Sequence, residues 1–378
     1  MERVLHISKY YYPFIGGIEQ TAKDCVNALS GKYEQKVICF NHEKGNQKSI
    51  VDGVQIIRCA CQMKVSSQSI SISMRKQLRE VIKEFSPNYV LIHYPNPFVS
   101  EILLPILPNN TKLILYWHLD ITKQKILGKV FHFQNCRLIK RADKIIATSP
   151  NYIEGSKYLS KVKEKCLVVP SCINEERLQI NEETKAISNK IRKNNENKII
   201  CLAVGRHVPY KGFEYLIRAA KKLDSRFSIF ITGKGELTPK LKELAKGDNK
   251  IHFLGAIDDN TLKAYYMATD IFCFPSITKN EAFGLALAEA MYFNKPAITF
   301  TIPGSGVNYV NLKEITGMEV ENRSIEEYTK ALQKLGTDSD LRKKYGKAAG
   351  ERVRNNFLYN QYKDNICKAF VFGEKKNE

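Results

Sequence analysis

The chain has 378 residues, 43% of them hydrophobic, and its 59 basic and 39 acidic residues give a formal net charge of +20 at pH 7. This length exceeds what one hydrophobic core usually supports, so we expect two domains. No apolar run approaches the roughly 18 residues that span a bilayer. The start, from Met1 to Ser8, is typical of a first strand and lacks the features of a signal peptide. We therefore expect a cytoplasmic protein.

The charge surplus predicts attraction to polyanions. Nucleic acid and anionic lipid headgroups are the two candidates. The basic residues are spread along the whole chain, and no zinc-finger, RNA-recognition or helix-turn-helix signature occurs. Charge alone does not choose between the two. The ten cysteines lack CxxC spacing, so we expect reduced, packed thiols.

Strand-like and helical stretches alternate along the first half, which is typical of an open parallel α/β sheet. A Pro/Gly loop leads from the first strand into a helix at about 18–29. The polar stretch 181–198 has few apolar anchors, and we place the domain boundary there. The expected strands of this half are 4–8, 36–41, 89–93, 112–117, 144–148 and 166–170.

The alternation restarts after the polar stretch, with a helix at about 213–223 and helical material from 324 to the C-terminal region. Ligands of such sheets bind outside the carboxyl ends of the strands, so two facing sheets predict a cleft. The expected strands of this half are 199–205, 227–232, 251–254, 271–275, 296–299 and 318–320.

The strongest motif follows the strand that ends at Pro275. A polar loop carries Glu281, and a helical sequence runs from about Phe283. Backbone N–H groups at a helix start are unpaired, and the helix dipole favours an anion there. Gly284 removes side-chain bulk where a phosphate would approach.

Glu281 and Glu289 are eight residues apart, a rise of roughly 12 Å if the whole span were helical. That separation suits two carboxylates that bracket a diphosphate, one on sugar hydroxyls and one on a ribose. The alternative is an acidic residue favoured by the helix dipole plus a solvent-facing Glu. Glu289 lies in an almost wholly apolar stretch, where a carboxylate is buried and needs partners. We therefore favour the binding role.

Two cations flank the turn from Gly205 to Gly212, directly after a strand. The planar guanidinium of Arg206 can bind two phosphate oxygens at once, and the ammonium of Lys211 adds a compact positive charge. Together they suit a diphosphate leaving group. In so basic a chain a single Arg or Lys is usually a surface residue. The pair at a strand end beside glycines favours a site.

These motifs together resemble the retaining GT-B glycosyltransferases of family 4. The resemblance rests on the E-x7-E spacing, on the Gly205–Gly212 turn and on the loop around Gly233. It extends to the N-terminal half, because His6 to Gly17 (HISKYYYPFIGG) is similar to the family's first strand and glycine loop. It covers nearly the full chain.

The resemblance implies a GT-B architecture of two Rossmann-like domains. Residues 1–180 would bind the acceptor and 195–355 the nucleotide sugar, and a helix at about 361–378 would pack back on the first domain. The amides of Gly16 and Gly17 would approach the donor phosphate. His118, in the segment similar to the family's H-x-D, would lie near the reacting sugar.

The donor side would be built from the motifs of the second half. Arg206 and Lys211 would neutralise the departing nucleoside diphosphate, Glu281 would hold sugar hydroxyls, and Glu289 the ribose. The remaining donor-binding residues would be Gly233, Ile257 in the segment that reads the base, and the amides of Phe283, Gly284 and Leu285.

One family segment is altered here. It appears as Pro170-Ser171-Cys172-Ile173-Asn174, without the family's glycine, so we leave it outside the site. A literal DxD at Asp338-Ser339-Asp340 precedes a helix, where an N-cap explains it. No other carboxylate or histidine cluster has metal spacing. We predict metal-independent turnover with no permanently bound cofactor.

The predicted function is transfer of a hexose-type sugar, with retention, from a UDP- or GDP-linked donor to a glycan or lipid-linked acceptor. The family often makes bacterial surface polysaccharides. The net charge would then reflect peripheral contact with an anionic inner leaflet. Two alternatives are a nucleotide-sugar epimerase or phosphorylase of the same fold, and a nucleic-acid-binding protein. The latter leaves Glu281 and Glu289 unexplained, so we expect no nucleic acid partner.

Overall fold

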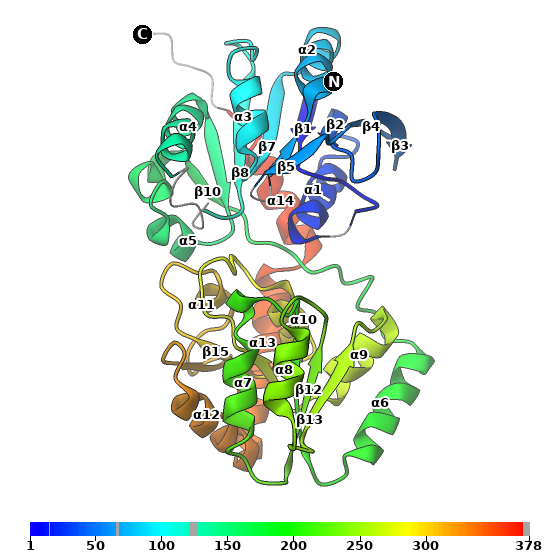
Figure 1. Cartoon of the computed structure of the whole chain (residues 1–378), viewed down its shortest axis with the longest axis vertical. Coiled ribbons are helices and arrows are strands. Elements are labelled where there is room, and N and C mark those ends of the chain that lie inside the picture. The colour runs from blue at the N-terminus through cyan, green and yellow to red at the C-terminus, as the bar shows by residue number, and fades with distance from the viewer. Residues whose placement is uncertain (15, 66–67, 121–127, 373–378) are drawn as a thin grey trace. The chain divides into compact units, whose positions relative to one another are not determined.

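The computed structural model describes residues 1–14, 16–65, 68–120 and 128–372. The chain divides into two compact units, whose elements are labelled in Figure 1. Unit 1 comprises Met1–Thr148, Ile153–Val169 and Tyr362–Glu378, and unit 2 comprises Ser149–Tyr152 and Pro170–Gln361. The last part of the predicted terminal helix, 373–378, lies outside the described residues.

This division differs from the predicted boundary at about residue 180. Residues 170–180 belong to unit 2 because Ile173 and Leu178 are buried in its core. The polar stretch 181–198 is also structured, since it contains helix α6 (Glu182–Asn194). Asn181 caps this helix by accepting a hydrogen bond from the Thr184 N–H, and a single buried isoleucine, Ile191, anchors it.

Unit 1 contains an eight-stranded sheet in the order β10-β9-β8-β7-β1-β2-β4-β3. All neighbours are parallel except β3 and β4, which form an antiparallel pair. Strand β7 is buried along its whole length, as expected for a parallel sheet covered on both faces. The strands are β1 (Arg3–Ile7), β2 (Glu34–Phe40), β3 (Gln47–Val51), β4 (Val54–Cys59), β7 (Tyr89–Tyr94), β8 (Lys112–Trp117), β9 (Lys144–Ala147) and β10 (Cys166–Val168). A separate antiparallel pair joins β5 (Met63–Val65) and β6 (Gln68–Ile70).

The helices of this half cover both faces of the sheet. The strand order reverses at β1, and right-handed crossovers then place α1 on one face and α2, α3 and α4 on the other. The helical segments are α1 (Gly17–Ala28), α2 (Ile72–Phe85), α3 (Pro97–Leu103), α4 (Gly128–Arg141), α5 (Pro150–Gly155), η1 (Leu159–Lys161) and η2 (Lys163–Lys165).

The last helix, α14 (Tyr359–Lys368), leads into residues that pack on unit 1. The ring of Phe370 lies 5.3 Å from the rings of both Tyr33 and Tyr89. The Lys32 ammonium donates to the Cys367 thiol at 3.2 Å. These contacts attach the end of the chain to the first sheet.

Unit 2 contains a six-stranded, fully parallel sheet in the order β13-β12-β11-β14-β15-β16. The chain winds outward from β11 to β13 and then returns to β14 on the other side, so the topological switch point lies between β11 and β14. The strands are β11 (Ile199–Val204), β12 (Phe227–Thr232), β13 (Ile251–Gly255), β14 (Ile271–Phe274), β15 (Ala297–Phe300) and β16 (Gly317–Val320). The helices after α6 are η3 (Pro209–Lys211), α7 (Phe213–Ala220), α8 (Thr238–Ala245), α9 (Asp259–Ala268), α10 (Leu285–Tyr292), α11 (Val307–Val310), α12 (Ile325–Thr337) and α13 (Ser339–Asn356).

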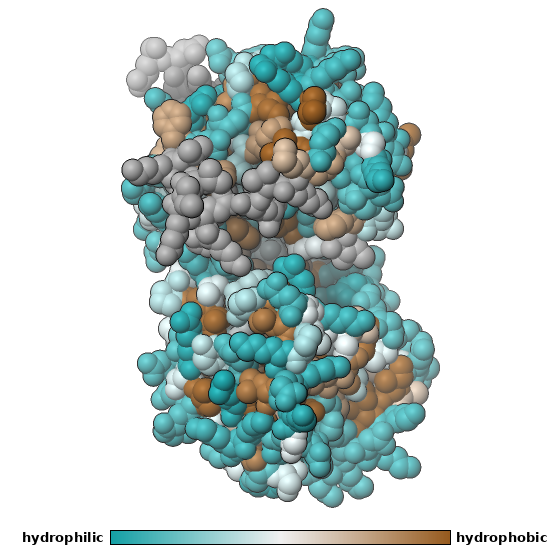
Figure 2. Space-filling view, in the orientation of Figure 1, coloured by the Kyte–Doolittle hydropathy of each residue, from teal (hydrophilic) through white to brown (hydrophobic). Residues whose placement is uncertain are grey.

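The two parallel sheets confirm the predicted α/β class with two Rossmann-like sheets. On the face drawn in Figure 2, hydrophilic residues cover most of the described surface, with hydrophobic patches between them. No described helix combines the length and the apolar composition needed to cross a membrane. All ten cysteines are free thiols, six of them buried and Cys136 exposed.

Candidate functional site

The loops after β11 and β14 meet at the switch point of the second sheet. The Ile277 N–H donates to the Tyr210 carbonyl at 2.9 Å, which joins the two loops through their backbones. Gly212 makes this approach possible: its φ is +63°, and a Cβ there would lie 2.1 Å from the Pro275 carbonyl oxygen. Any other residue would push the loops apart.

Lys211 and Glu281, one on each loop, form an ion pair. Their side chains are 13% and 12% exposed. The Ser276 hydroxyl also donates to Glu281 Oε2, at 3.1 Å. Among the described residues, Glu281 Oε1 has no hydrogen-bond partner, and the Lys211 ammonium retains N–H donors beyond the one on Glu281. The pair therefore offers an acceptor for a hydroxyl and donors for an anion.

Arg206 lies two residues beyond the end of β11 and is exposed. Its guanidinium has no ion-pair or hydrogen-bond partner within the described parts of the chain. A free guanidinium presents its five N–H donors to solvent or to a ligand, in a geometry that matches phosphate oxygens.

Helix α10 begins at Leu285, two residues later than predicted. Gly284 precedes it in the left-handed conformation, with φ 96°, which a residue with a Cβ rarely adopts. A Cβ at Gly284 would also lie 3.1 Å from Phe274 Cζ. The helix therefore starts only after this turn.

The backbone N–H groups at this turn are unsatisfied. Those of Phe283, Gly284 and Leu285 donate no hydrogen bond to any other described residue. The first N–H groups of a helix have no partner within the helix, so these three remain able to donate to an anion. Phe283 as a whole is only 4% exposed, and its ring packs against the Phe357 ring at 5.3 Å.

Glu289 lies on α10, its side chain is 12% exposed, and it has two partners. Arg177 forms an ion pair with its Oε1, and the Tyr266 hydroxyl donates to Oε2 at 2.9 Å. Burial raises the pKa of Glu289, and the Arg177 charge and the Tyr266 hydrogen bond oppose that shift. Glu289 thus has the partners that its apolar sequence context called for, while its role in binding stays a prediction. Both of its oxygens are already engaged.

Arg177 was not predicted. It also pairs with Asp259 at 3.0 Å, so it connects the start of α9 to Glu289 on α10. It follows the altered Pro170–Asn174 segment that we left outside the site. The sequence signalled only that Glu289 needs a partner, and 112 residues separate the two.

Gly233 lets three strand ends lie together. Its φ is +118°, and a Cβ there would lie 1.9 Å from the Gly205 carbonyl oxygen. The Gly233 N–H donates to the Gly255 carbonyl at 2.7 Å. This glycine is thus required by packing between the loops after β11, β12 and β13. Ile257 is half-buried in the short connection between β13 and α9.

The glycine loop of unit 1 leads into α1, with Gly16 as the N-cap residue. A Cβ on Gly16 would lie 2.2 Å from Glu19 Oε2, whereas a Cβ on Gly17 would meet no atom of the described residues within 4 Å. No crowding explains a glycine at position 17. The open space beside it leaves the backbone accessible to a ligand.

His118 follows the end of β8 and is 6% exposed. Its Nε2 lies 3.0 Å from His93 Nδ1, and its ring stacks on Tyr116 at 4.5 Å. Burial lowers the pKa of His118 to about 3, so the imidazole is neutral at physiological pH. His93, which sequence reasoning missed, is the penultimate residue of the neighbouring strand β7 and occupies one nitrogen of His118.

The model of the glycosyl transferases of group 1 matches residues 184–352, and the model of glycosyltransferase family 4 matches residues 15–177. Between them they cover most of the chain. The chain belongs to the family 4 glycosyltransferases. It is an enzyme of that class, and the predicted family is confirmed.

Relatives of this family 4 glycosyltransferase extend over its length. The O-antigen chain mannosyltransferase C of Escherichia coli is 26% identical, over 98% of this chain and 97% of its own. The D-rhamnosyltransferase WbpZ of Pseudomonas aeruginosa is 28% identical, over 94% and 92%. The fold resembles that of HepE of Anabaena in complex with UDP-glucose, with a TM-score of 0.76, 14% identity and coverage of 98% and 99%. The GT-B fold is thereby confirmed.

The literal DxD of this glycosyltransferase has a structural role. Asp338 is the N-cap of α13, and its side chain accepts from the Leu341 N–H at 2.8 Å. Within the described ranges, no group of three or more His, Cys, Asp or Glu residues could hold a metal ion.

Proposed function

We propose that this glycosyltransferase moves a hexose-type sugar, with retention of anomeric configuration, from a UDP- or GDP-linked donor to a glycan or lipid-linked acceptor. The acceptor would belong to a bacterial surface polysaccharide. The names of the mannosyl- and rhamnosyltransferase relatives support the sugar class and the O-antigen type of product. The UDP-glucose bound by the fold relative HepE supports a nucleotide-sugar donor. The E-x7-E resemblance supports retention.

One observation carries this proposal: unsatisfied amides and cations converge on the switch point of unit 2. The free N–H groups of Phe283, Gly284 and Leu285, the Lys211 ammonium and the Arg206 guanidinium all follow β11 or β14. Such groups stabilise the negative charge that develops on a departing diphosphate. Glu281 Oε1 would accept a hydroxyl of the transferred sugar, and Glu289 would hold the ribose.

Binding of a ribose by Glu289 has to be compatible with the two partners that this carboxylate already has. Because Arg177 and Tyr266 occupy its two oxygens, a ribose hydroxyl would use a remaining lone pair or displace one partner. Each carboxylate oxygen accepts about two hydrogen bonds, so both routes are open. Arg177 is therefore expected to influence nucleotide affinity without contacting the reacting sugar.

In unit 1, the amides of Gly16 and Gly17 would approach the donor phosphate. Neutral His118 would hold a sugar hydroxyl by a hydrogen bond, because a group with a pKa of about 3 is a weak base at neutral pH. Catalysis would rest on positioning and leaving-group stabilisation.

A thermal-shift screen with UDP, GDP and their sugar conjugates tests the donor site and identifies the base. A ligand at a hundred times its Kd stabilises the folded chain by about 2.7 kcal/mol. We expect one nucleoside diphosphate to raise the unfolding temperature. A chain indifferent to all of them would contradict the proposal.

Product analysis by NMR then tests the reaction. Retention predicts that the anomeric configuration of the product matches that of the donor. An epimerase would instead isomerise the donor without acceptor, and a phosphorylase would require free phosphate. We further propose that transfer needs no metal, since cations and amides fill that role. Activity abolished by EDTA and restored by Mg²⁺ would contradict this.

The proposed acceptor places the enzyme in the cytoplasm, at the inner face of the plasma membrane. The net charge of +20 supports contact with anionic lipid there. Binding to anionic liposomes at low salt is the expected result, and absence of binding at every salt concentration would remove this part of the proposal.

A further inference from the structure

Unit 1 contains a cavity of about 340 Å³ beside the C-terminal half of α4. The described residues that line it come from α4 and from the segment 157–165, and its surface is mainly apolar. Ile139, Tyr158 and Val162 are among the residues that line it. No contact of the candidate site involves these residues.

Lysines surround the apolar interior. Lys140, Lys157 and Lys161 are exposed, and within the described ranges their ammonium groups have no ion-pair or hydrogen-bond partner. A fourth lysine, Lys165, is different, because it donates to the carbonyls of Ile139, Lys140 and Ala142 at 2.8–3.2 Å and so caps α4. The cavity thus has an apolar interior and three free cations at its rim.

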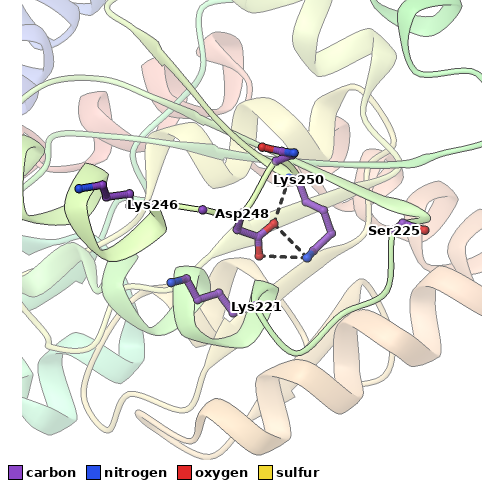
Figure 3. Close-up of a pocket in the computed structure, with 7 residues that line it drawn as sticks. Lys221, Ser225, Lys246, Asp248 and Lys250 are labelled. Carbon is purple, nitrogen blue, oxygen red and sulfur yellow. Dashed lines mark hydrogen bonds and ion pairs between the residues drawn. The ribbon is translucent and has the colours of Figure 1, made fainter.

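A cavity in unit 2, drawn in Figure 3, shows that lysines alone do not make such a site. It measures about 410 Å³ and is lined by Lys221, Lys246 and Lys250. There Asp248 supplies a counter-ion, since the Lys250 ammonium donates to Asp248 Oδ2 at 3.0 Å. The residues that line it are polar, and Lys250 directly precedes β13. It lies at the amino ends of the strands, opposite the candidate site.

The surface beside the unit 1 cavity is also adapted to an amphiphile. Phe133 on α4 is 64% exposed, and the Arg137 guanidinium, which also pairs with Glu101 at 3.2 Å, lies 5.6 Å from its ring centroid. Exposed aromatic side chains flanked by cations are typical of surfaces that bind the headgroup region of a membrane.

We propose that this basic apolar pocket, lined by Ile139, Tyr158 and Val162 and rimmed by Lys140, Lys157 and Lys161, binds an anionic phospholipid. One acyl chain enters the cavity, and the phosphate lies on the three ammonium groups. Transfer of each CH₂ group out of water favours the first contact, and the unpartnered charges favour the second. A nucleic acid or a free phosphate would use the rim and leave the apolar interior empty. This inference rests on the membrane contact assumed in the proposed function and specifies the lipid that makes it. Its test does not depend on sugar transfer.

The rim is tested by co-sedimentation with phosphatidylcholine vesicles prepared with and without phosphatidylglycerol. Each lysine near an anionic surface changes the partition coefficient about fivefold, so Lys140→Gln/Lys157→Gln/Lys161→Gln should lower it about a hundredfold. The control Lys221→Gln/Lys240→Gln/Lys246→Gln removes the same charge from exposed positions of unit 2 and should lower it by less than about fivefold. Equal losses in the two variants would overturn the proposal.

The interior is tested with Trp117, the single tryptophan of the chain. Its ring lies 5.7 Å from that of Tyr158, which lines the pocket. Phosphatidylglycerol brominated on its acyl chains should quench Trp117 fluorescence, and Val162→Asp should reduce the quenching while the far-UV spectrum stays unchanged. Vesicle binding without quenching would mean adsorption on the surface only. Release by inorganic phosphate at unchanged ionic strength would mean a headgroup site only. Either result would overturn the proposal.

Discussion

Replacing Lys211 by Met should separate the structural role of the Lys211–Glu281 ion pair from its role in transfer. Both side chains are nearly nine-tenths buried, and within the described chain Ser276 is the remaining partner of Glu281. Removing one member of a buried pair costs about 3–5 kcal/mol, because the other charge stays uncompensated. We expect about 3 kcal/mol, since each side chain retains some contact with water. For a unit of about 200 residues this lowers the unfolding temperature by roughly 6–12 °C.

The matched variant Glu281→Gln should destabilise unit 2 by a similar amount. The double variant removes both charges together and should be no less stable than either single variant, which gives a coupling energy of about 3 kcal/mol. Transfer should fall about 100-fold or more in all three variants. Calorimetry measures the unfolding of unit 2, while Trp117 fluorescence reports unit 1 as an internal reference. Additive destabilisation, or a double variant with restored transfer, would refute the reasoning.

Three further predictions concern other parts of the structure. Gly17→Ala at the start of α1 should leave the free energy of unfolding equal or slightly higher, because Ala favours helix over Gly by about 1 kcal/mol, yet it should lower kcat/KM. If thermal melts and rate assays show a fall in both stability and kcat/KM, Gly17 has a structural role instead. Calorimetry of Arg177→Met should show unit 2 destabilised by about 2–3 kcal/mol, less than for a fully buried pair because Arg177 is 35% exposed. The variant should change nucleotide affinity more than kcat. An unchanged melting temperature would show that Glu289 does not need Arg177 as a partner. Burial lowers the pKa of His6 to about 4, so the unfolded chain binds this proton more tightly than the folded chain. The contribution of His6 to stability is fully present above about pH 6.5 and falls by about 1.4 kcal/mol per pH unit from there towards pH 4. His6→Asn should reduce the acid slope of unit 1 by about 1.4 kcal/mol per pH unit, while buried His93 and His118 keep the rest. Urea unfolding followed by Trp117 fluorescence measures this slope, and an identical slope in the variant would contradict the prediction.

Apolar runs predicted most strands of both sheets because buried parallel strands need continuous hydrophobic sequence. The run at 112–117, for example, corresponds to β8 as the structure has it. The hairpin β3–β4 was missed because its edge strand β3 is largely exposed and polar. Such a strand carries no periodic apolar signal, and its pairing with β4 supplies the order.

The candidate site was predictable where a local motif carries the chemistry. Glu281, Gly284 and the Arg206/Lys211 turn were identified from their place after a strand, and the structure joins Lys211 to Glu281. The start of α10 was placed too early because Phe283 is a good helix residue, whereas the left-handed Gly284 delays the helix.

Partners that come from distant parts of the chain could not be identified in this way. Arg177 approaches Glu289 only because the segment after residue 170 packs against unit 2. His93 meets His118 only because β7 and β8 pair in register, with His93 opposite Tyr116. Neither relation leaves a trace in local spacing.

The central claim is that the switch point of unit 2 binds a diphosphate, and isothermal titration of Arg206→Gln tests it most directly. Arg206 is exposed and its side chain has no partner in the described structure, so the variant should fold as stably as the natural chain. The natural chain should bind the preferred nucleoside diphosphate more than tenfold more tightly than the matching monophosphate, because only the diphosphate reaches both cations. Arg206→Gln should lose most of that preference while its affinity for the monophosphate changes little. A variant that keeps the full preference for the diphosphate would contradict the account.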